Sequence, residues 1–143
     1  MVSTKGRYAL RVMIDMAERH TDTYIPLKDI ADKQQISLKY LEAIIKLLVR
    51  AKLVKGLRGK GGGYKLTRKP EEYTIGEILE LTEGDLSPVA CLTDHADACD
   101  RADSCPTLPM WKKLKQLEHD FYYGITLEDL MTPMTPDAWE KHQ

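Results

Sequence analysis

The chain of 143 residues is 43% hydrophobic and 30% charged, a composition typical of a globular protein that buries a core in one or two small domains. No segment approaches the roughly 20 consecutive apolar residues of a membrane-spanning helix, which excludes an integral membrane protein of helical type. The first residues lead into an amphipathic pattern rather than a secretory signal, so we expect a cytoplasmic protein.

Charge is divided unevenly along the chain, although the net charge is only −1. Residues 1–70 contain 16 lysines and arginines against 6 acidic residues, whereas residues 71–143 contain 5 against 16. This asymmetry favours a basic half that binds a polyanion and an acidic half with another role. The alternative is that both halves are simply solvated surfaces.

Three helices are expected in the first third of the chain. Apolar residues at helical spacing predict them over residues 4–20, 27–34 and 38–51, with Ser37 as the N-cap of the third. The outer face of the third helix carries Lys39, Glu42 and Lys46. Two short helices joined by a tight turn, the second with a basic outer face, are typical of a helix-turn-helix, although an ordinary helical hairpin has the same spacing.

A β-hairpin is predicted next, with strands over residues 53–58 and 64–68. The glycine-rich run between them, residues 59–63, supplies the positive φ angles that a tight turn requires. A basic hairpin directly after a helix-turn-helix is typical of a wing that lies along DNA phosphates or enters the minor groove. A phosphate-binding loop is the competing interpretation, but Gly61 stands where that loop requires Ser or Thr.

The acidic half begins with a predicted helix from the capping box of Thr74 and Glu77 to about Thr82, followed by an irregular loop over residues 84–106. A longer helix is predicted over 108–123, because apolar residues recur there at spacings of four, three and four: Met110, Leu114, Leu117 and Phe121. This apolar seam suits either a partner helix or the chain's own domain. Thr126 then caps a short helix through Met131, and the tail from Thr132 is expected to be loosely ordered.

The three cysteines, Cys91, Cys99 and Cys105, all lie in the predicted loop, with seven and five residues between them. An odd, clustered set without an export signal argues against a disulfide framework and favours metal or redox chemistry. The gaps are wider than the Cys-x-x-Cys pairs common in structural zinc sites, and no such pair supports a dithiol redox enzyme. Iron–sulfur ligation, zinc binding and free redox thiols all stay open on this evidence.

Four motifs carry a family resemblance: STKGRYA at residues 3–9, ISLKYLE at 36–42, RGKGGGY at 58–64 and ITLEDL at 125–130. With them, residues 1–131 resemble the Rrf-type winged helix-turn-helix transcriptional regulators, which include IscR-, NsrR- and CymR-like members. The resemblance implies a mainly α fold with a small hairpin wing, and a homodimeric regulator, expected to be a repressor rather than an enzyme. It divides the chain into a DNA-binding domain (1–83), a cysteine-containing sensor loop (84–106), a dimerisation helix with a short C-terminal helix (107–131) and a tail (132–143).

By the same resemblance, residues 38–50 form the recognition helix. The residues expected to contact double-stranded DNA lie on that helix and at the tip of the wing: Lys39, Tyr40, Glu42, Lys46, Arg58, Gly59 and Lys60. Arg58 suits a specific or minor-groove contact, because a guanidinium fits narrow grooves and guanine edges. Lys60 stands where iron–sulfur regulators of this type often have Pro, which implies a wing that relies more on charge. A two-fold dimer requires a roughly palindromic operator.

Cluster-binding members of the family carry three cysteines in this loop, before a Trp such as Trp111. The resemblance therefore implies an iron–sulfur cluster on the three cysteines, expected to be of the two-iron, two-sulfur type, with a four-iron cluster as the alternative. Leu108 and Tyr8 replace the fourth ligands that IscR-like and NsrR-like proteins use. His95 is the candidate in their place, and its alternative role is that of a surface loop histidine. Other candidates are Asp94, Asp97, Asp100, Asp103, the partner subunit or solvent.

The predicted function is thus a regulator that senses redox state, nitric oxide or iron–sulfur status. The alternative within the family is a cluster-free regulator controlled by a partner protein or a small metabolite, as in CymR-like members. Non-specific nucleic-acid binding is a further alternative, because the basic half alone would provide it.

Overall fold

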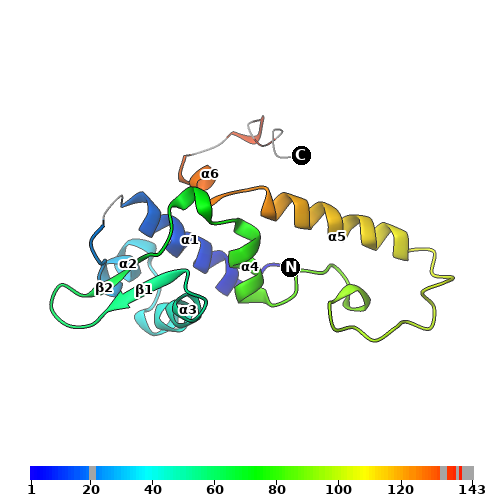
Figure 1. Cartoon of the computed structure of the whole chain (residues 1–143), viewed down its shortest axis with the longest axis horizontal. Helices are drawn as coiled ribbons and strands as arrows, with labels where there is room; N and C mark the ends of the chain where they lie inside the picture. Colours follow the sequence, from blue (N-terminus) through cyan, green and yellow to red (C-terminus); the bar gives the residue numbers. More distant parts are fainter. Residues whose placement is uncertain (20–21, 133–134, 138, 140–143) are drawn as a thin grey trace.

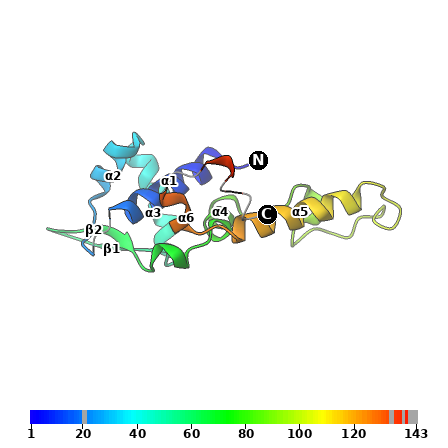
Figure 2. The ribbon, with the colours of Figure 1, turned by 90° about the horizontal axis from the view of Figure 1, so that it is seen from above.

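The computed structural model describes residues 1–19, 22–132, 135–137 and 139. A helical body carries a two-stranded antiparallel hairpin, and one long helix projects from that body (Figures 1 and 2). The predicted mainly α fold with a hairpin wing is confirmed. The predicted tail lies largely outside the described residues, as does the predicted end of the first helix at His20. Within the described part of the chain, no helix has the length and apolar character needed to cross a membrane.

The first three helices are α1 (Thr4–Glu18), α2 (Leu27–Gln34) and α3 (Leu38–Arg50), each within two residues of its predicted bounds. The hydroxyl of Ser37 accepts a hydrogen bond from the backbone N–H of Tyr40 and so caps α3. Gln35 has a φ of 54°, a left-handed conformation that turns the chain sharply between α2 and α3. The inner face of α3 is fully buried: Leu41, Ile44, Ile45 and Leu48.

A buried carboxylate links α1 to the end of α2. Asp15 is 0% exposed and accepts hydrogen bonds from the Arg19 guanidinium and from the amide of Gln34, the latter at 2.7 Å. Arg11 donates to the backbone oxygen of the same glutamine. Because a buried charge is stable only when paired, this network fixes the helix-turn-helix geometry from the α1 side.

The wing consists of β1 (Val54–Leu57) and β2 (Gly63–Leu66), each shorter than predicted. Residues 58–62 form the turn, which a hydrogen bond from the N–H of Gly62 to the oxygen of Gly59 closes at 3.0 Å. Ile25 pairs with Tyr64 through backbone bonds of 2.8 and 2.9 Å, so the link after α1 lies along β2. A Cβ on Gly63 would lie 2.2 Å from the backbone oxygen of Ile25, and this approach therefore requires glycine.

Tyr73 anchors the base of the wing. Its ring is 0% exposed, and its hydroxyl donates to the oxygen of Leu53 at 2.7 Å. The same hydroxyl accepts the backbone N–H groups of Thr67 and Arg68, each at 3.0 Å. The Tyr73 hydroxyl thus supplies backbone hydrogen-bond partners at both ends of the hairpin, before β1 at Leu53 and after β2 at Thr67 and Arg68.

The acidic half contributes α4 (Ile75–Glu83), the long helix α5 (Leu108–Tyr123) and α6 (Leu127–Met131). Thr74 caps α4 as predicted, but the carboxylate of Glu77 pairs with Arg68 instead of completing the predicted capping box. Leu127 of α6 is buried in the same core as α1 and α3. The C-terminal segment therefore packs against the N-terminal body.

In both views α5 extends away from the body, and only its C-terminal end packs on α4 (Figures 1 and 2). There the ring of Tyr123 lies against Gly76, where an added Cβ would be 2.4 Å from the ring. No residue of α5 is buried in the single chain, and its apolar seam is open, with Met110 54%, Leu117 53% and Phe121 41% exposed. The predicted helix is confirmed. The structure contains one chain, so the contact of this seam with a partner subunit stays a prediction.

Candidate nucleic-acid interface and cysteine loop

The outer face of α3 is free to meet a ligand. Lys39, Glu42 and Lys46 are all exposed, and none of them forms an ion pair with another described residue. The two ammonium groups are therefore available to phosphates, which attract lysine irrespective of base sequence.

Tyr40 has a different environment from the other predicted contact residues of α3. Its side chain is half-buried and packs edge-on against Tyr8 of α1, with ring centroids 5.7 Å apart and planes at 79°. Arg11 lies over the ring of Tyr8, 5.1 Å from its centroid. The α1 contacts therefore position the N-terminal end of α3 through this aromatic pair.

The predicted tip of the wing is solvent-exposed. Arg58, Gly59 and Lys60 all lie in the turn between the strands, and the φ of Gly59 is 92°. The structure thus brings the charged tip and α3 onto one body, where α3 packs against β1 (Figure 1). Such an arrangement can present a helix to one groove and a hairpin to the adjacent phosphates.

The base of the wing is held by an ion pair that sequence patterns did not indicate. Arg68 donates to Glu77 at 2.7 Å and lies 4.4 Å from the ring centroid of Tyr73. The hydrogen bond with Glu77 raises the pKa of the Arg68 guanidinium above its ordinary value. The return strand is therefore tied to α4, the helix that leads into the cysteine loop.

The first half of the cysteine loop is fixed to α5. The carboxylate of Asp85 accepts the backbone N–H groups of Ser87 at 2.6 Å and Asp94 at 2.9 Å. Hydrogen bonds lower the pKa of Asp85 to about 2, with the larger effect from Ser87 and a smaller one from the N–H of Asp94. The ammonium of Lys115 donates to the oxygen of Leu92 at 2.6 Å. A cavity of about 520 Å³ lies beside this segment, and His95 is among its lining residues.

The three cysteines do not meet in this structure. Cys91 lies in a short 3₁₀ helix (Ala90–Leu92) and is exposed, as is Cys99. Cys105 is half-buried before the start of α5, and the hydroxyl of Thr107, 3.4 Å from its sulfur, lowers the pKa of the thiol. Among the described residues no three His, Cys, Asp or Glu side chains are grouped to hold a metal ion, so His95 does not lie in such a group with the cysteines.

Several positioning residues were missed by sequence reasoning: Asp15, Tyr73, Asp85 and Lys115. Only Asp15 gave a usable signal, because it lies three residues after Val12, at the edge of the apolar stripe of the first helix. The other three make contacts across 9 to 23 residues, which no local pattern reports.

A family model named Rrf2, described as "Iron-dependent Transcriptional regulator", matches residues 2–133. The chain is 35% identical over 130 residues to the HTH-type transcriptional regulator IscR of Aliivibrio salmonicida, covering 91% of this chain and 76% of the relative. It is 37% identical over 129 residues to the HTH-type transcriptional regulator CymR of Bacillus subtilis, covering 90% and 88%.

Solved structures agree with these relationships. CymR (YrzC), the global cysteine regulator of B. subtilis, superposes with a TM-score of 0.74 at 35% identity, covering 92% of this chain and 95% of that one. IscR of T. potens superposes with a TM-score of 0.72 at 33% identity, covering 92% and 85%. The predicted resemblance is confirmed, and with it the prediction of a regulator rather than an enzyme. The chain belongs to the Rrf2 family of winged-helix transcriptional regulators.

Proposed function

We propose that this protein is a homodimeric, cytoplasmic repressor that binds a roughly palindromic operator and senses redox state, nitric oxide or iron–sulfur status through a cluster on its loop cysteines. The observation that carries the DNA-binding part is the unpaired cationic face of α3 beside an exposed basic wing tip. The open seam of α5 supports the dimer, because three large apolar side chains on one helix stay about half exposed in the single chain, Phe121 despite its contacts with the rings of Tyr122 and Trp139.

The chemistry of the exposed groups indicates which of them would contact phosphates and which would contact bases. Lys39, Lys46 and Lys60 would neutralise phosphates and give affinity that falls with salt. Arg58 and Glu42 would read base edges, because a guanidinium pairs with guanine and a carboxylate accepts from cytosine. Gly59 would let the backbone of the wing approach the sugar-phosphate chain closely.

The DNA-binding part is tested by selecting an operator from a random duplex library and measuring its affinity by fluorescence anisotropy over a range of salt concentrations. Arg58→Glu/Lys60→Glu should weaken binding and reduce the slope of log affinity against log salt by about 2, because Lys60 of each protomer then fails to neutralise a phosphate worth about 0.9; loss of Arg58 should also relax the base preference. Lys112→Glu/Lys113→Glu makes the same change of charge at two exposed positions of α5 outside the named seam residues, and is the matched control once sedimentation velocity shows that its oligomeric state is that of the wild type. Equal effects of the two double variants would refute the assignment of the wing.

The cysteine loop fits an iron–sulfur cluster by the chemistry of its donors. Cys91, Cys99 and Cys105 supply three soft thiolates, the ligands that such clusters prefer. The hydrogen bonds of described residues 95–104 are local turns, as from Ala102 to Cys99, so this segment can rearrange with little disturbance of the rest of the fold. His95 is our candidate for the fourth ligand. When bound, the cluster would supply an iron centre that responds to oxidants and nitric oxide.

The residues around the loop indicate how sensing would reach DNA. Asp85 and Lys115 hold the first half of the loop on α5, while residues 95–104 would move to gather the thiolates. Glu83, at the end of α4, accepts hydrogen bonds from the N–H and hydroxyl of Ser3 at the start of α1. Ordering of the loop would therefore bias the orientation of α5 relative to the DNA-binding body, and with it the separation of the two recognition helices.

Iron and sulfide content with a visible spectrum, recorded on anaerobically purified protein, tests the cluster. We expect both elements in the wild type, their loss in Cys99→Ala and their retention in Ser104→Ala, a neighbouring substitution in the same exposed segment. Operator affinity should differ between the loaded and cluster-free forms. Equal affinities would reject the sensing mechanism, and absence of iron from the wild type would favour a cluster-free regulator controlled by a partner protein or metabolite.

A further inference from the structure

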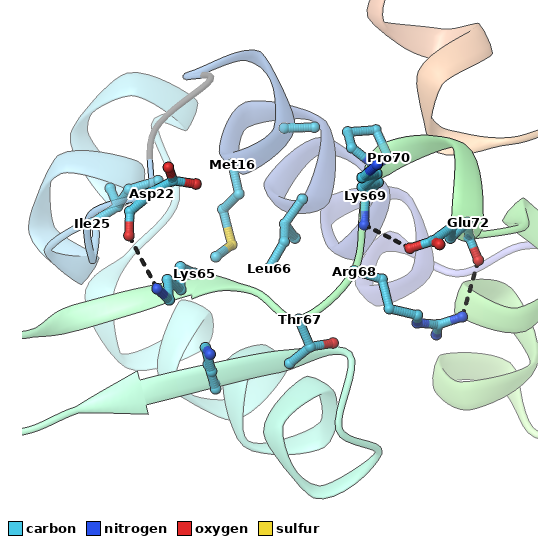
Figure 3. A pocket seen from close by; sticks show the side chains of 12 residues that line it. Met16, Asp22, Ile25, Lys65, Leu66, Thr67, Arg68, Lys69, Pro70 and Glu72 are labelled. Atoms are coloured by element: carbon cyan, nitrogen blue, oxygen red, sulfur yellow. Dashed lines mark hydrogen bonds between the residues drawn. The ribbon is translucent and has the colours of Figure 1, made fainter.

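A cavity of about 430 Å³ lies at the base of the wing, and none of its lining residues is among those proposed to contact DNA or a cluster. Figure 3 shows it between the end of α1, the link at residues 22–25, the hairpin strands and the turn that follows them. Met16 of α1 and Leu66 of β2 converge on it, and Ile25 completes an apolar wall. Its volume lies within the range of small-molecule sites.

Three lysines surround this apolar wall. Lys55 and Lys65 are direct cross-strand partners, a pairing of like charges that destabilises a hairpin unless an anion compensates it. Lys65 is held in place, since it donates to the backbone oxygen of Asp22 at 3.0 Å and lies 4.8 Å from the ring centroid of Tyr24. Lys55 and Lys69 form no ion pair with any described residue.

The other charged groups of the lining are in part engaged elsewhere. The carboxylate of Glu72 accepts the backbone N–H of Lys69 at 3.0 Å, and Asp22 is the second acid of the lining. The guanidinium of Arg68 is directed to the oxygen of Glu72 at 2.9 Å and to Glu77. Among the cationic groups of the lining, Lys55 and Lys69 are therefore the ones available to a ligand, and Lys65 uses one of its three N–H donors on Asp22 and keeps the other two.

We propose that this wing-base cavity binds a small organic anion, with a carboxylate or phosphate among Lys55, Lys65 and Lys69 and an apolar group against Met16 and Leu66. The consequence for regulation rests on the proposed DNA-binding function. The walls of the cavity belong to α1 and to the wing, which are joined beside it by the Ile25–Tyr64 backbone pair. A ligand that bridges these walls would fix the angle of the wing and change operator affinity, by about 5- to 150-fold if the coupling is typical.

Binding is tested on the full chain without DNA, by calorimetry with phenyl phosphate and phthalate as probes and with neutral benzyl alcohol as a negative control. We expect at least one anionic probe to bind and to shift the methyl resonance of Met16. Lys55→Gln/Lys69→Gln should weaken that binding by about tenfold or more, because two charge-assisted bonds are removed. The matched control, Lys112→Gln/Lys113→Gln, removes two exposed charges from α5 and should leave it unchanged.

Failure of both probes to bind, or equal binding of a probe to the two double variants, would overturn the proposal. So would probe binding that leaves operator affinity unchanged. If no probe binds while Lys55→Gln/Lys69→Gln lowers the salt dependence of operator binding, these lysines serve a DNA phosphate instead. Because the calorimetry needs no operator, failure of the proposed DNA-binding function would be recognised separately.

Discussion

Removal of one buried hydroxyl, by Tyr73→Phe, should destabilise the whole domain. The backbone N–H of Arg68 would lose its 3.0 Å acceptor, at a cost of about 1–3 kcal/mol for an unsatisfied buried group. The N–H of Thr67 and the oxygen of Leu53 keep a mutual contact at 3.4 Å, so their loss is smaller, about 0.5 kcal/mol each. The free energy of unfolding should therefore fall by about 2–4 kcal/mol.

Urea denaturation followed by circular dichroism, at one fixed protein concentration, measures this change, because dimerisation would make stability depend on concentration. Tyr122→Phe is the matched control, since no hydrogen bond of the Tyr122 hydroxyl is found in the described part of the chain. A loss below about 0.5 kcal/mol in Tyr73→Phe, or an equal loss in both variants, would show that the hydroxyl does not anchor the wing.

Three further predictions concern the wing, the loop and α5. Gly63→Ala should destabilise the protein by more than about 2 kcal/mol in urea denaturation, because its Cβ would meet the oxygen of Ile25, whereas Gly61→Ala, with open space around it, should cost less; the reverse order would contradict the turn geometry. The NMR chemical shift of the Asp85 carboxyl carbon, followed as a function of pH, should give a pKa of about 2. Since this value lies below that of the unfolded chain, Asp85 contributes stability that is fully present above about pH 4 and lost as the pH falls toward 2, and an ordinary pKa would disprove the loop contacts. Leu117→Glu should convert the dimer to a monomer in sedimentation velocity, and an unchanged dimer would exclude the α5 seam as the interface.

Much of the local structure could be predicted because it depends on groups close together in the chain. The bounds of α2, the cap at Ser37 and the buried face of α3 each follow from hydrogen bonds or periodicity within about four residues. The apolar seam of α5 follows from the same periodicity, but its exposure in the single chain does not, because the pattern suits a partner helix and the chain's own domain equally. The strands of the wing were predicted too long: the ladder ends at Leu57 before Arg58, and after Leu66 the N–H groups of Thr67 and Arg68 bond to the hydroxyl of Tyr73 instead of continuing it.

The candidate site divides in the same way. The positions of Lys39 and Lys46 on an exposed helix face follow from local pattern, whereas the same pattern placed Arg58 in a strand and only the family resemblance placed it at the tip of the wing; their contacts with DNA stay predictions. That Cys91, Cys99 and Cys105 are not gathered into one metal-binding group could not be predicted, because an irregular loop has no periodicity to relate distant residues.

The amino-acid sequence by itself determined the helices, the hairpin and the division of charge, since helical spacing, caps and glycine turns act over a few neighbouring residues. Only the tertiary structure decided that Asp15 is buried, that Tyr73 closes the base of the wing and that Leu127 enters the N-terminal core. These outcomes depend on contacts between elements far apart in the chain, such as the 2.7 Å bond between residues 20 positions apart at Tyr73 and Leu53. Such contacts form only when the elements pack, because a buried polar group then needs whichever partner the fold brings to it.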